Sequence, residues 1–366
     1  MLHRQCRWPL SNVRVCLNLL EIKLETIRED FQKEEVAALE QYCRFLMSKE
    51  LSTVEKVTVA IERLFVKYCR GSNSERYGVF LSKIVGYSVW LLYRLDPYFK
   101  QELHRRALSI SYFFKEPEKK ALGLLQRQHL NRYRQVLSRE RLYSGGVAQG
   151  AGYAWPEREA YRRYIKGSEQ SRILLGVHLG DFIDAYLHIG RESHENWSVL
   201  VPRREEADGD ALANTALSSN LTLLHANKYS PAAMATRLRN GRHTLAIMAD
   251  LHSGFGETVP VRFLGQSARF VKGPACIALL SACPVIPFVS FHQDKQNHIV
   301  MSEVIHPTVH SGETFSDAVS RLTQKFATFC EHWVKRYPEQ WKFLAEANLF
   351  LDKSLMRSKP AKGGEC

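Results

Sequence analysis

RILLGVHLGDFID, residues 172–184, gives the strongest indication of the fold, and the candidate site lies within it. Ile173 to Val177 form a short apolar run, which is typical of a buried strand, and the residues after Gly180 have helical character. The stretch therefore predicts a strand that ends beside a helix N-terminus. His178 lies between the two, at the carboxyl end of the strand, where open α/β sheets bind their ligands.

From Ser171 onward, apolar runs alternate with helical segments. The strand-like runs are RILLGVHLG, WSVLVP, NLTLLHA, HTLAIMAD, CPVIPFVSF and HIVMSEVI. The helical segments between and after them include Pro231 to Leu238, Gly273 to Ser281 and Phe315 to Arg336. Strands that alternate with helices predict an α/β fold whose sheet is covered by helices on both faces.

The first part of the chain has a different pattern, which suggests a separate region. Apolar positions at helical spacing predict three amphipathic helices over residues 17–70, followed by the loop-like Gly71-Ser72-Asn73-Ser74. We expect an N-terminal helical extension at 1–73, an α/β domain at 74–350 and a basic flexible tail at 351–366. Within the α/β domain, basic membrane-proximal helices are expected at 74–150 and the catalytic core at 171–345.

The positive charge of the chain is concentrated in one helical window. The chain has 366 residues and a formal net charge of +13. The window from Arg94 to Arg141 holds twelve Lys or Arg and five Asp or Glu, and it follows an aromatic, apolar helix. This combination is typical of a protein that sits on an anionic membrane surface. No helix-turn-helix, zinc-finger or RRM pattern is present, so we expect no nucleic-acid partner.

Composition excludes several other classes of protein. A hydrophobic content of 45% excludes a disordered chain. The apolar run Ile84 to Tyr93 is too short to span a bilayer, and Pro284 and Pro287 interrupt the run from Gly273 to Gln293, so no membrane span is expected. Charged residues, among them Arg14 and Glu21, interrupt the N-terminal segment, so no signal peptide is expected either. The eight cysteines form no CxxC pair, which is typical of a reduced chain, and the sequence predicts no metal site.

The residues around His178 predict proton-transfer chemistry. A histidine at a strand end accepts a proton from an attacking hydroxyl when a carboxylate holds its ring. Asp181 and Asp184 are the nearby candidates for that carboxylate. Two structural alternatives remain, since Asp181 also fits a helix cap and Asp184 is spaced to pair with His188 at i, i+4.

Further candidates follow the other predicted strands. Asp250 lies at a second strand end, with His252 beside it, and we expect both to face the same site. Arg203 and Arg204 follow another strand, and a guanidinium there would bind a phosphate. An ordinary loop ion pair is the alternative for these arginines.

Seven segments, taken together in their order and spacing, resemble those of a known family. They are ALSISYFF (107–114), HLGDFID (178–184), PRR (202–204), AIMADLHSG (246–254), VRFLG (261–265), KGPACIALLSACPVIP (272–287) and RYPEQWKF (336–343). Through them, Tyr77 to Leu344, about three quarters of the chain, resemble the lipid A late acyltransferases of the lysophospholipid acyltransferase superfamily.

The resemblance implies an α/β fold with a mixed central sheet and a peripheral enzyme on the cytoplasmic face of the inner membrane. Such an enzyme moves an acyl group from an acyl carrier protein or acyl-CoA thioester to a hydroxyl of a lipid acceptor. It implies no metal and no bound cofactor. His178 would be the general base, and donors at the helix N-terminus or a nearby arginine would hold the oxyanion.

The sequence departs from the family's pattern at the centre. The family has an acid five positions after the histidine, where this chain has Ile183. Asp250-Leu251-His252 stands where many relatives have two acids around one residue, and Lys228 stands where a further basic residue, an arginine, is expected. The resemblance therefore leaves open which aspartate partners His178. With Arg203 and Arg204, Lys228 and His252 are the residues expected to bind substrate.

Three functions remain open from the sequence alone. The first is a lipid acyltransferase with an altered His/Asp centre. The second is a transferase of an aminoacyl group such as glycine, or of a biosynthetic intermediate, from an acyl or peptidyl carrier protein. The third is a catalytically inactive scaffold of the same fold.

Overall fold

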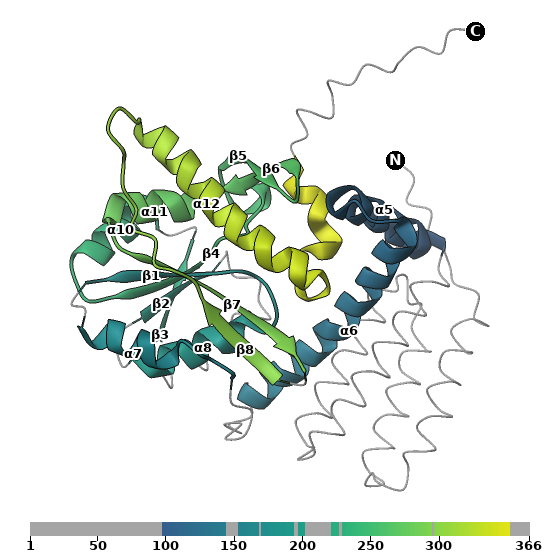
Figure 1. Ribbon diagram of the computed structural model, residues 1–366, viewed down its shortest axis with the longest axis horizontal. Coiled ribbons are helices and arrows are strands. Elements are labelled where there is room, and N and C mark those ends of the chain that lie inside the picture. The colour runs from purple at the N-terminus through teal and green to yellow at the C-terminus, as the bar shows by residue number, and fades with distance from the viewer. Residues whose placement is uncertain are drawn as a thin grey trace, which may run out of the picture.

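The computed structural model describes residues 97–143, 153–167, 170–193, 197–201, 221–226, 229–294 and 296–351 (Figure 1). The N-terminal helical extension and the basic tail that the sequence predicts lie outside these residues, apart from Leu351. The predicted boundary between the extension and the α/β domain, after residue 73, lies outside them as well.

A six-stranded mixed sheet forms the centre of the molecule, in the order β3-β2-β4-β1-β7-β8. Its strands β1, β2, β3, β4 and β7 run parallel, and β8 pairs antiparallel with β7 at one edge. The bounds are β1 Arg172–Gly176, β2 Trp197–Val201, β3 Leu221–His225, β4 Thr244–Met248, β7 Val285–Gln293 and β8 Gln296–Met301. All six arise from the predicted runs, so the predicted α/β class with a mixed sheet is confirmed.

Both faces of the sheet are covered, which explains why its inner strands are apolar throughout. In β1, Ile173 and Leu175 join one hydrophobic cluster, whereas Leu174 joins the other. The first cluster includes side chains from α5 (Pro97–Phe114), α6 (Glu118–Tyr143), α10 (Pro231–Arg239), α11 (Gly273–Ser281) and α12 (Phe315–Arg336). The second includes side chains from α7 (Arg158–Gly167) and α8 (Phe182–Ser193), on the opposite side of the sheet in Figure 1.

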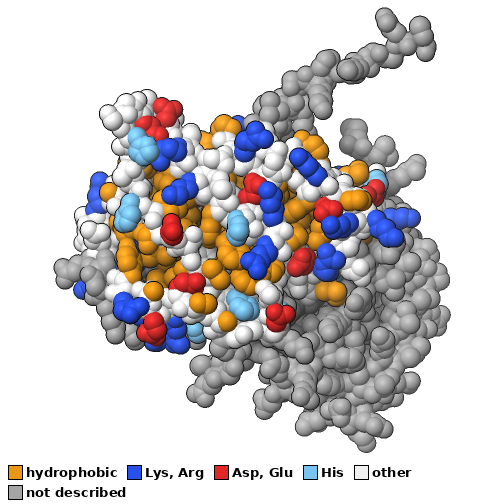
Figure 2. All heavy atoms as spheres, in the orientation of Figure 1, with side chains coloured by type: hydrophobic (Ala, Val, Ile, Leu, Met, Phe, Trp, Pro, Cys, Tyr) orange, Lys and Arg blue, Asp and Glu red, His pale blue; other side chains and the backbone are white. Residues whose placement is uncertain are grey.

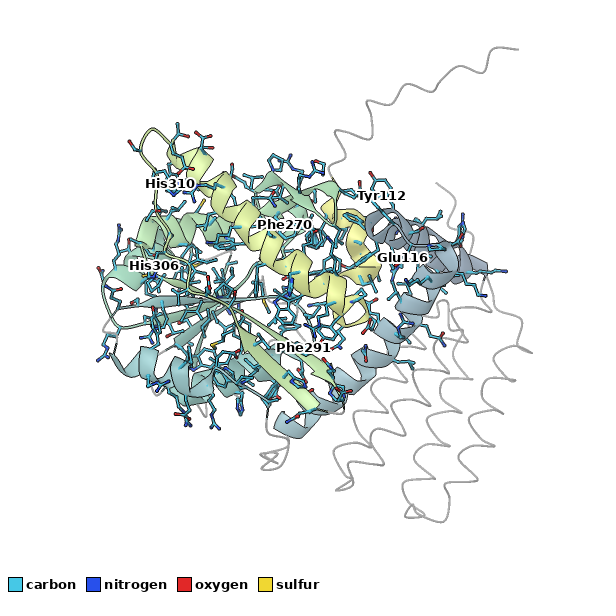
Figure 3. All side chains as sticks on the ribbon, viewed as in Figure 1. Tyr112, Glu116, Phe270, Phe291, His306 and His310 are labelled. Carbon is cyan, nitrogen blue, oxygen red and sulfur yellow. The ribbon has the colours of Figure 1, made fainter. Side chains whose placement is uncertain are left out.

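A separate hairpin packs beside α12. Strands β5 (Thr258–Phe263) and β6 (Gln266–Val271) pair antiparallel around Leu264 and Gly265, whose φ angles of 54° and 73° suit a two-residue hairpin turn. The carboxylate of Glu331 in α12 accepts from the Leu264 backbone N–H at 2.8 Å. Phe270, labelled in Figure 3, lies in β6 and is fully buried. The hairpin is therefore anchored to the helix and to the core.

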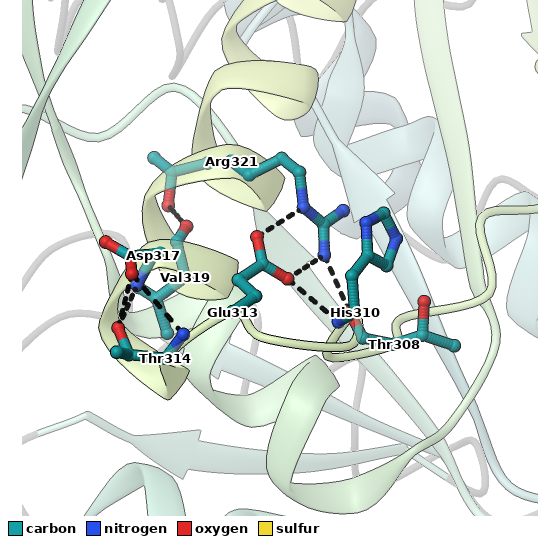
Figure 4. A network of polar contacts seen from close by, with 8 residues as sticks. Thr308, His310, Glu313, Thr314, Asp317, Val319 and Arg321 are labelled. Atoms are coloured by element: carbon teal, nitrogen blue, oxygen red, sulfur yellow. Dashed lines mark hydrogen bonds and ion pairs between the residues drawn. The ribbon is translucent and has the colours of Figure 1, made fainter.

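The N-terminus of α12 carries the polar network drawn in Figure 4. Thr314 and Asp317 form a capping box, in which each side chain satisfies the backbone N–H of the other residue. Arg321 donates two hydrogen bonds to Glu313, at 2.7 and 2.9 Å, and a third to the Thr308 carbonyl. The network ties the loop before α12 to the first two turns of the helix.

Helices α5 and α6 contain most of the basic window from Arg94 to Arg141. The chain turns between them near Glu116, which Figure 3 labels, and Lys120 in the first turn of α6 pairs with that carboxylate. Farther along α6, the Gln128 amide donates to the carbonyls of Trp341 and Lys342 at 2.8 and 2.9 Å. Among the described helices, none combines the length and the apolar character that crossing a bilayer requires.

Candidate active site

The loop after β1 holds His178 between the sheet and the start of α8. Gly180 in this loop has φ of +56°, and a Cβ there would lie 2.5 Å from the Ser290 carbonyl oxygen. Only glycine therefore fits this backbone position without a shift of β7. Ser290 also donates from its hydroxyl to the Leu179 carbonyl at 3.0 Å, so the loop is held closely against the sheet.

Asp250 is the carboxylate that holds the His178 ring. Its Oδ1 lies 2.9 Å from His178 Nδ1, and its two oxygens accept from the His178 backbone N–H at 3.0 and 3.1 Å. Asp250 follows the neighbouring strand β4 and is fully buried, and only 10% of the His178 side chain is exposed. The two residues are joined because β1 and β4 are parallel neighbours whose carboxyl ends meet at one edge.

Trp341 completes the support of this carboxylate. Its indole Nε1–H donates to Asp250 Oδ2 at 2.8 Å, and the whole residue is buried. The segment that carries it pairs with the His178 loop, because the Lys342 N–H donates to the His178 carbonyl and the Gly180 N–H donates to the Gln340 carbonyl. Asp250 therefore accepts from the ring, the backbone and the indole, which fixes the orientation of its carboxylate.

Asp181 and Asp184 do not occupy the position that the sequence predicted for one of them. The carboxylate at Nδ1 belongs to Asp250, which lies 72 residues after the histidine. Asp184 lies in the first turn of α8 and accepts from the Tyr153 hydroxyl at 2.7 Å. Burial, reinforced by the charges of Asp181 and Asp184, raises the pKa of Tyr153 well above its usual range. The two aspartates thus share a neighbourhood around a buried phenol.

The physical reason for this correction is the geometry of the loop. Asp184, in the first turn of α8, is engaged by the Tyr153 hydroxyl, whereas Asp250 follows β4, the parallel neighbour of β1, and comes beside His178 directly. The acid that the family has at the position of Ile183 is therefore not replaced by an aspartate next to it in sequence. A carboxylate from the adjacent strand fills the role at Nδ1 instead.

His252 lies close to the same centre. It follows Asp250 by two residues, is 9% exposed, and its ring packs against Phe343 with 5.4 Å between centroids. The His178 ring packs on that same phenylalanine at 4.9 Å. Burial is the main cause that lowers the pKa of His252 below its usual range. The structure thus brings together His178, Asp250 and His252.

Aromatic rings and a cation surround the His178 ring. Besides Phe343, Phe182 meets it edge-on, with 4.8 Å between centroids. The Lys342 ammonium lies 5.8 Å from the centres of both phenylalanine rings, and its side chain is exposed. A positive charge is therefore present at the edge of the site.

Three of the predicted substrate-binding residues cannot be placed. Arg203, Arg204 and Lys228 lie outside the described residues, so their roles stay predictions. Within the described part of the chain, no group of three or more His, Cys, Asp or Glu side chains is arranged to hold a metal ion.

Trp341 is the site residue that the sequence alone did not single out. It lies within the segment RYPEQWKF, to which the sequence assigned no chemical role. Its partner Asp250 lies 91 residues earlier, and no local pattern connects an indole to a carboxylate at that separation. The pairing of the Trp341 segment with the His178 loop is what brings the two together.

The arrangement can act as a general base. With Asp250 accepting at Nδ1, the neutral ring carries its proton there and leaves the lone pair on Nε2. When Nε2 takes a proton, the buried carboxylate stabilises the imidazolium that forms. A hydroxyl group that reaches Nε2 is thereby activated as a nucleophile.

Comparison with known proteins supplies the family. The model of a protein family described as bacterial lipid A biosynthesis acyltransferase matches residues 164–347, which is half of the chain. The match includes β1, the His178 loop, Asp250 and the Trp341 segment. A search of curated proteins found no match.

Proposed function

This chain belongs to the bacterial lipid A biosynthesis acyltransferase family and is an acyltransferase, and from that membership we propose its substrates and its mechanism. It transfers an acyl group from a thioester, on a carrier protein or on CoA, to a hydroxyl group of a lipid acceptor of the lipid A type. The observation that carries the proposal is the His178–Asp250 pair, with 2.9 Å between Nδ1 and Oδ1 at the end of β1.

His178 begins the reaction as the general base. Its Nε2 removes the proton from the acceptor hydroxyl, and the oxygen attacks the thioester carbonyl carbon. The carbonyl π pair moves to oxygen, and when it returns, the C–S bond breaks. The proton on His178 passes to the departing sulfur, so an ester and a thiol result and the enzyme is regenerated. The balance of this reaction requires no metal and no bound cofactor.

Asp250 and Trp341 serve as positioning residues in this proposal. Neither touches the reacting atoms, but Asp250 fixes the tautomer that keeps the lone pair on Nε2. Trp341 holds Asp250 through its Oδ2. In addition, Lys342, Arg203 and Arg204 are candidates to bind acidic groups of the acceptor or donor.

The proposed location is the cytoplasmic face of the inner membrane, with peripheral attachment. On α5, Leu108 and Tyr112 are one turn apart and are 49% and 52% exposed, and the basic residues Arg105 and Lys115 flank them. Apolar side chains with basic neighbours favour binding to an anionic leaflet. The face in Figure 2 carries both basic and acidic side chains among apolar ones, so it is not uniformly basic. We therefore propose that α5, and not this whole face, contacts the membrane.

The test compares the wild-type chain with His178→Ala. Full-length protein in vesicles that contain anionic lipid is given a lipid A precursor with an acyl carrier protein or acyl-CoA donor, and intact lipid mass is measured. We expect a long-chain acyl increment with the wild-type protein and a loss of about 10²–10⁴-fold in rate for His178→Ala. His306→Asn, which alters an exposed histidine before α12, is the matched control.

Two results would contradict the proposal. An increment the size of an amino acid, formed only with an aminoacyl carrier protein, would replace the fatty acyl donor by the aminoacyl alternative. Equal rates for the wild-type protein and His178→Ala would remove His178 from the mechanism.

A further inference from the structure

The ring of His252 is held in one tautomer by its own backbone. Its Nδ1 accepts from the Gly254 N–H at 3.1 Å, as the N-cap of the short 3₁₀ helix η2 (Ser253–Phe255). A ring nitrogen that accepts a hydrogen bond carries no proton, so the proton of the neutral ring is on Nε2. His252 therefore presents an N–H donor at Nε2, whereas His178 presents a lone pair there.

The position of the His252 ring is also fixed by close packing. A Cβ added to Gly254 would lie 2.8 Å from the ring carbon Cε1, so the imidazole lies directly against the backbone. Phe255, Phe343 and Phe350 meet the ring edge-on, with centroids 4.7, 5.4 and 5.5 Å away. A donor held on all these sides does not need to reorganise when a charge forms near it.

The two histidines face a common neighbourhood. Phe343 contacts both rings, and His252 follows the Asp250 carboxylate by only two residues. Among the residues that the structure describes, none forms a hydrogen bond with Nε2 of either ring. A base and a donor thus stand next to one another, both available to a bound molecule.

The surroundings of His252 favour the neutral form of its ring. Burial lowers its pKa, and the nearby His178 lowers it further. The carboxylates of Glu346, in η4 (Leu344–Phe350), and Asp250 act in the opposite direction but do not cancel the effect of burial. A neutral ring keeps the Nε2–H without placing a second full charge beside the imidazolium that His178 becomes.

We propose that His252 is a second catalytic residue, whose Nε2–H donates a hydrogen bond to the oxyanion that forms on the thioester carbonyl. The inference rests on the proposed acyl transfer and assigns its missing electrophilic group. As His178 removes the hydroxyl proton and the new C–O bond forms, the carbonyl π pair moves to oxygen. His252 stabilises that oxygen until the C–S bond breaks and C=O is restored, and it neither gains nor loses a proton in the cycle.

The test uses two substitutions that separate the two ring nitrogens. His252→Asn places an amide oxygen where Nδ1 accepts from Gly254, so the cap is kept, but it removes the donor at Nε2. His252→Gln reaches farther and returns an N–H near the original Nε2. We expect kcat to fall by about 10²–10³-fold in His252→Asn with little change in KM, and part of that loss to be restored in His252→Gln.

Gly254→Ala provides a third variant, which keeps the imidazole and displaces it. Because the added Cβ would meet the ring at 2.8 Å, we expect kcat to fall here as well, with thermal unfolding close to that of the wild-type protein. His306→Asn is again the matched control, and its kcat should equal that of the wild-type protein. Wild-type kcat in His252→Asn would overturn the inference.

A measurement that needs no turnover checks the tautomer itself. Nitrogen-15 NMR of the full-length protein, assigned with His252→Asn, should show a neutral His252 ring protonated at Nε2 at pH 7. A ring protonated at Nδ1, or charged at that pH, would overturn the inference. Activity that is lost in His178→Ala but kept in His252→Asn overturns this inference alone, whereas a wild-type protein that transfers no acyl group overturns the proposed function and this inference together.

Discussion

At the scale of single residues, Asp250 organises the centre by accepting hydrogen bonds from three different kinds of group. The His178 ring, the His178 backbone and the Trp341 indole all donate to its two oxygens. A buried carboxylate that loses one of these donors is left partly unsatisfied, which costs about 1–3 kcal/mol. The support from Trp341 is therefore open to a direct test.

We expect Trp341→Phe to weaken both the site and the fold. The phenyl ring keeps part of the packing against Phe263, Phe343 and Phe350, but Oδ2 of Asp250 loses its indole donor. Because His178 is then held less firmly, kcat should fall by about tenfold or more while KM changes little. Steady-state kinetics and urea unfolding measure the two effects.

Trp333→Phe is the matched control for that substitution. It removes a similar volume from the stack that Trp333 forms with Phe291 and Tyr337, whose rings are not among those that contact Trp341. A loss of kcat in Trp333→Phe equal to the loss in Trp341→Phe would contradict the role given to the indole N–H.

At the scale of secondary structure, His178 and Asp250 both depend on strands that the sequence predicts. The carboxyl ends of β1 and β4 carry His178 and Asp250, and the register between the strands aligns Gly176 with Met248. Helix α12 supports the core on one face, and its start is stabilised by the network around Glu313. Glu313 in that network is a titratable group, so the stabilisation depends on pH.

Glu313→Gln should destabilise the protein at neutral pH but not in acid. The hydrogen bonds from Arg321 and the His310 backbone lower the pKa of Glu313 to about 2. A carboxyl group whose pKa is depressed on folding stabilises the protein above its unfolded pKa of about 4.5, and this contribution is lost as the pH falls toward 2. The melting temperature of Glu313→Gln should therefore be below that of the wild-type protein at pH 7.

The difference in melting temperature should shrink as the pH falls from 4.5 toward 2. Glu303→Gln, at an exposed position before the same helix, is the control. Its melting temperature should equal that of the wild-type protein at every pH. A Glu313→Gln effect that is equal at pH 7 and pH 3 would contradict the ion-pair origin of the stabilisation.

At the scale of the whole molecule, a buried histidine makes stability depend on pH. His243 precedes β4, is 7% exposed, and lies 2.9 Å from the Ser198 hydroxyl through Nε2. Burial, with a smaller contribution from the charge of Arg237, lowers its pKa from 6.5 to about 4. The folded chain therefore resists protonation at pH values where the unfolded chain is already protonated.

We expect the free energy of unfolding to decrease as the pH falls from about 6.5 to 4. In that window the unfolded state binds the proton more strongly, so acid favours unfolding, with an upper limit of about 3–4 kcal/mol from this one group. Urea unfolding at pH 4.5, 5.5, 6.5 and 7.5 measures the slope. His243→Gln, which does not titrate, should give a shallower slope, and an unchanged slope would contradict the assignment to His243.

The six strands of the central sheet, the helices α10, α11 and α12, and the strand-end position of His178 could be predicted from the amino-acid sequence. They follow from short-range physics, because a strand buried on both faces must be apolar throughout and a helix must repeat its apolar positions with its own period. Gly273 to Ser281 and Phe315 to Arg336 were predicted with the bounds that the structure has. The strand end at His178 follows from the same reasoning.

That Asp250 and His252 face the same site as His178 follows from the strand end they share, but which carboxylate holds the His178 ring could not be predicted in this way. Nearness along the chain favours Asp181 and Asp184 as the partner of the ring. The partner at Nδ1 is Asp250, held in turn by Trp341, and neither residue is near His178 in sequence. The order of the strands places Asp250 beside His178, and the pairing of Leu179 with Trp341 places the indole beside Asp250. Both depend on contacts between residues far apart in the sequence, which a local sequence pattern does not contain.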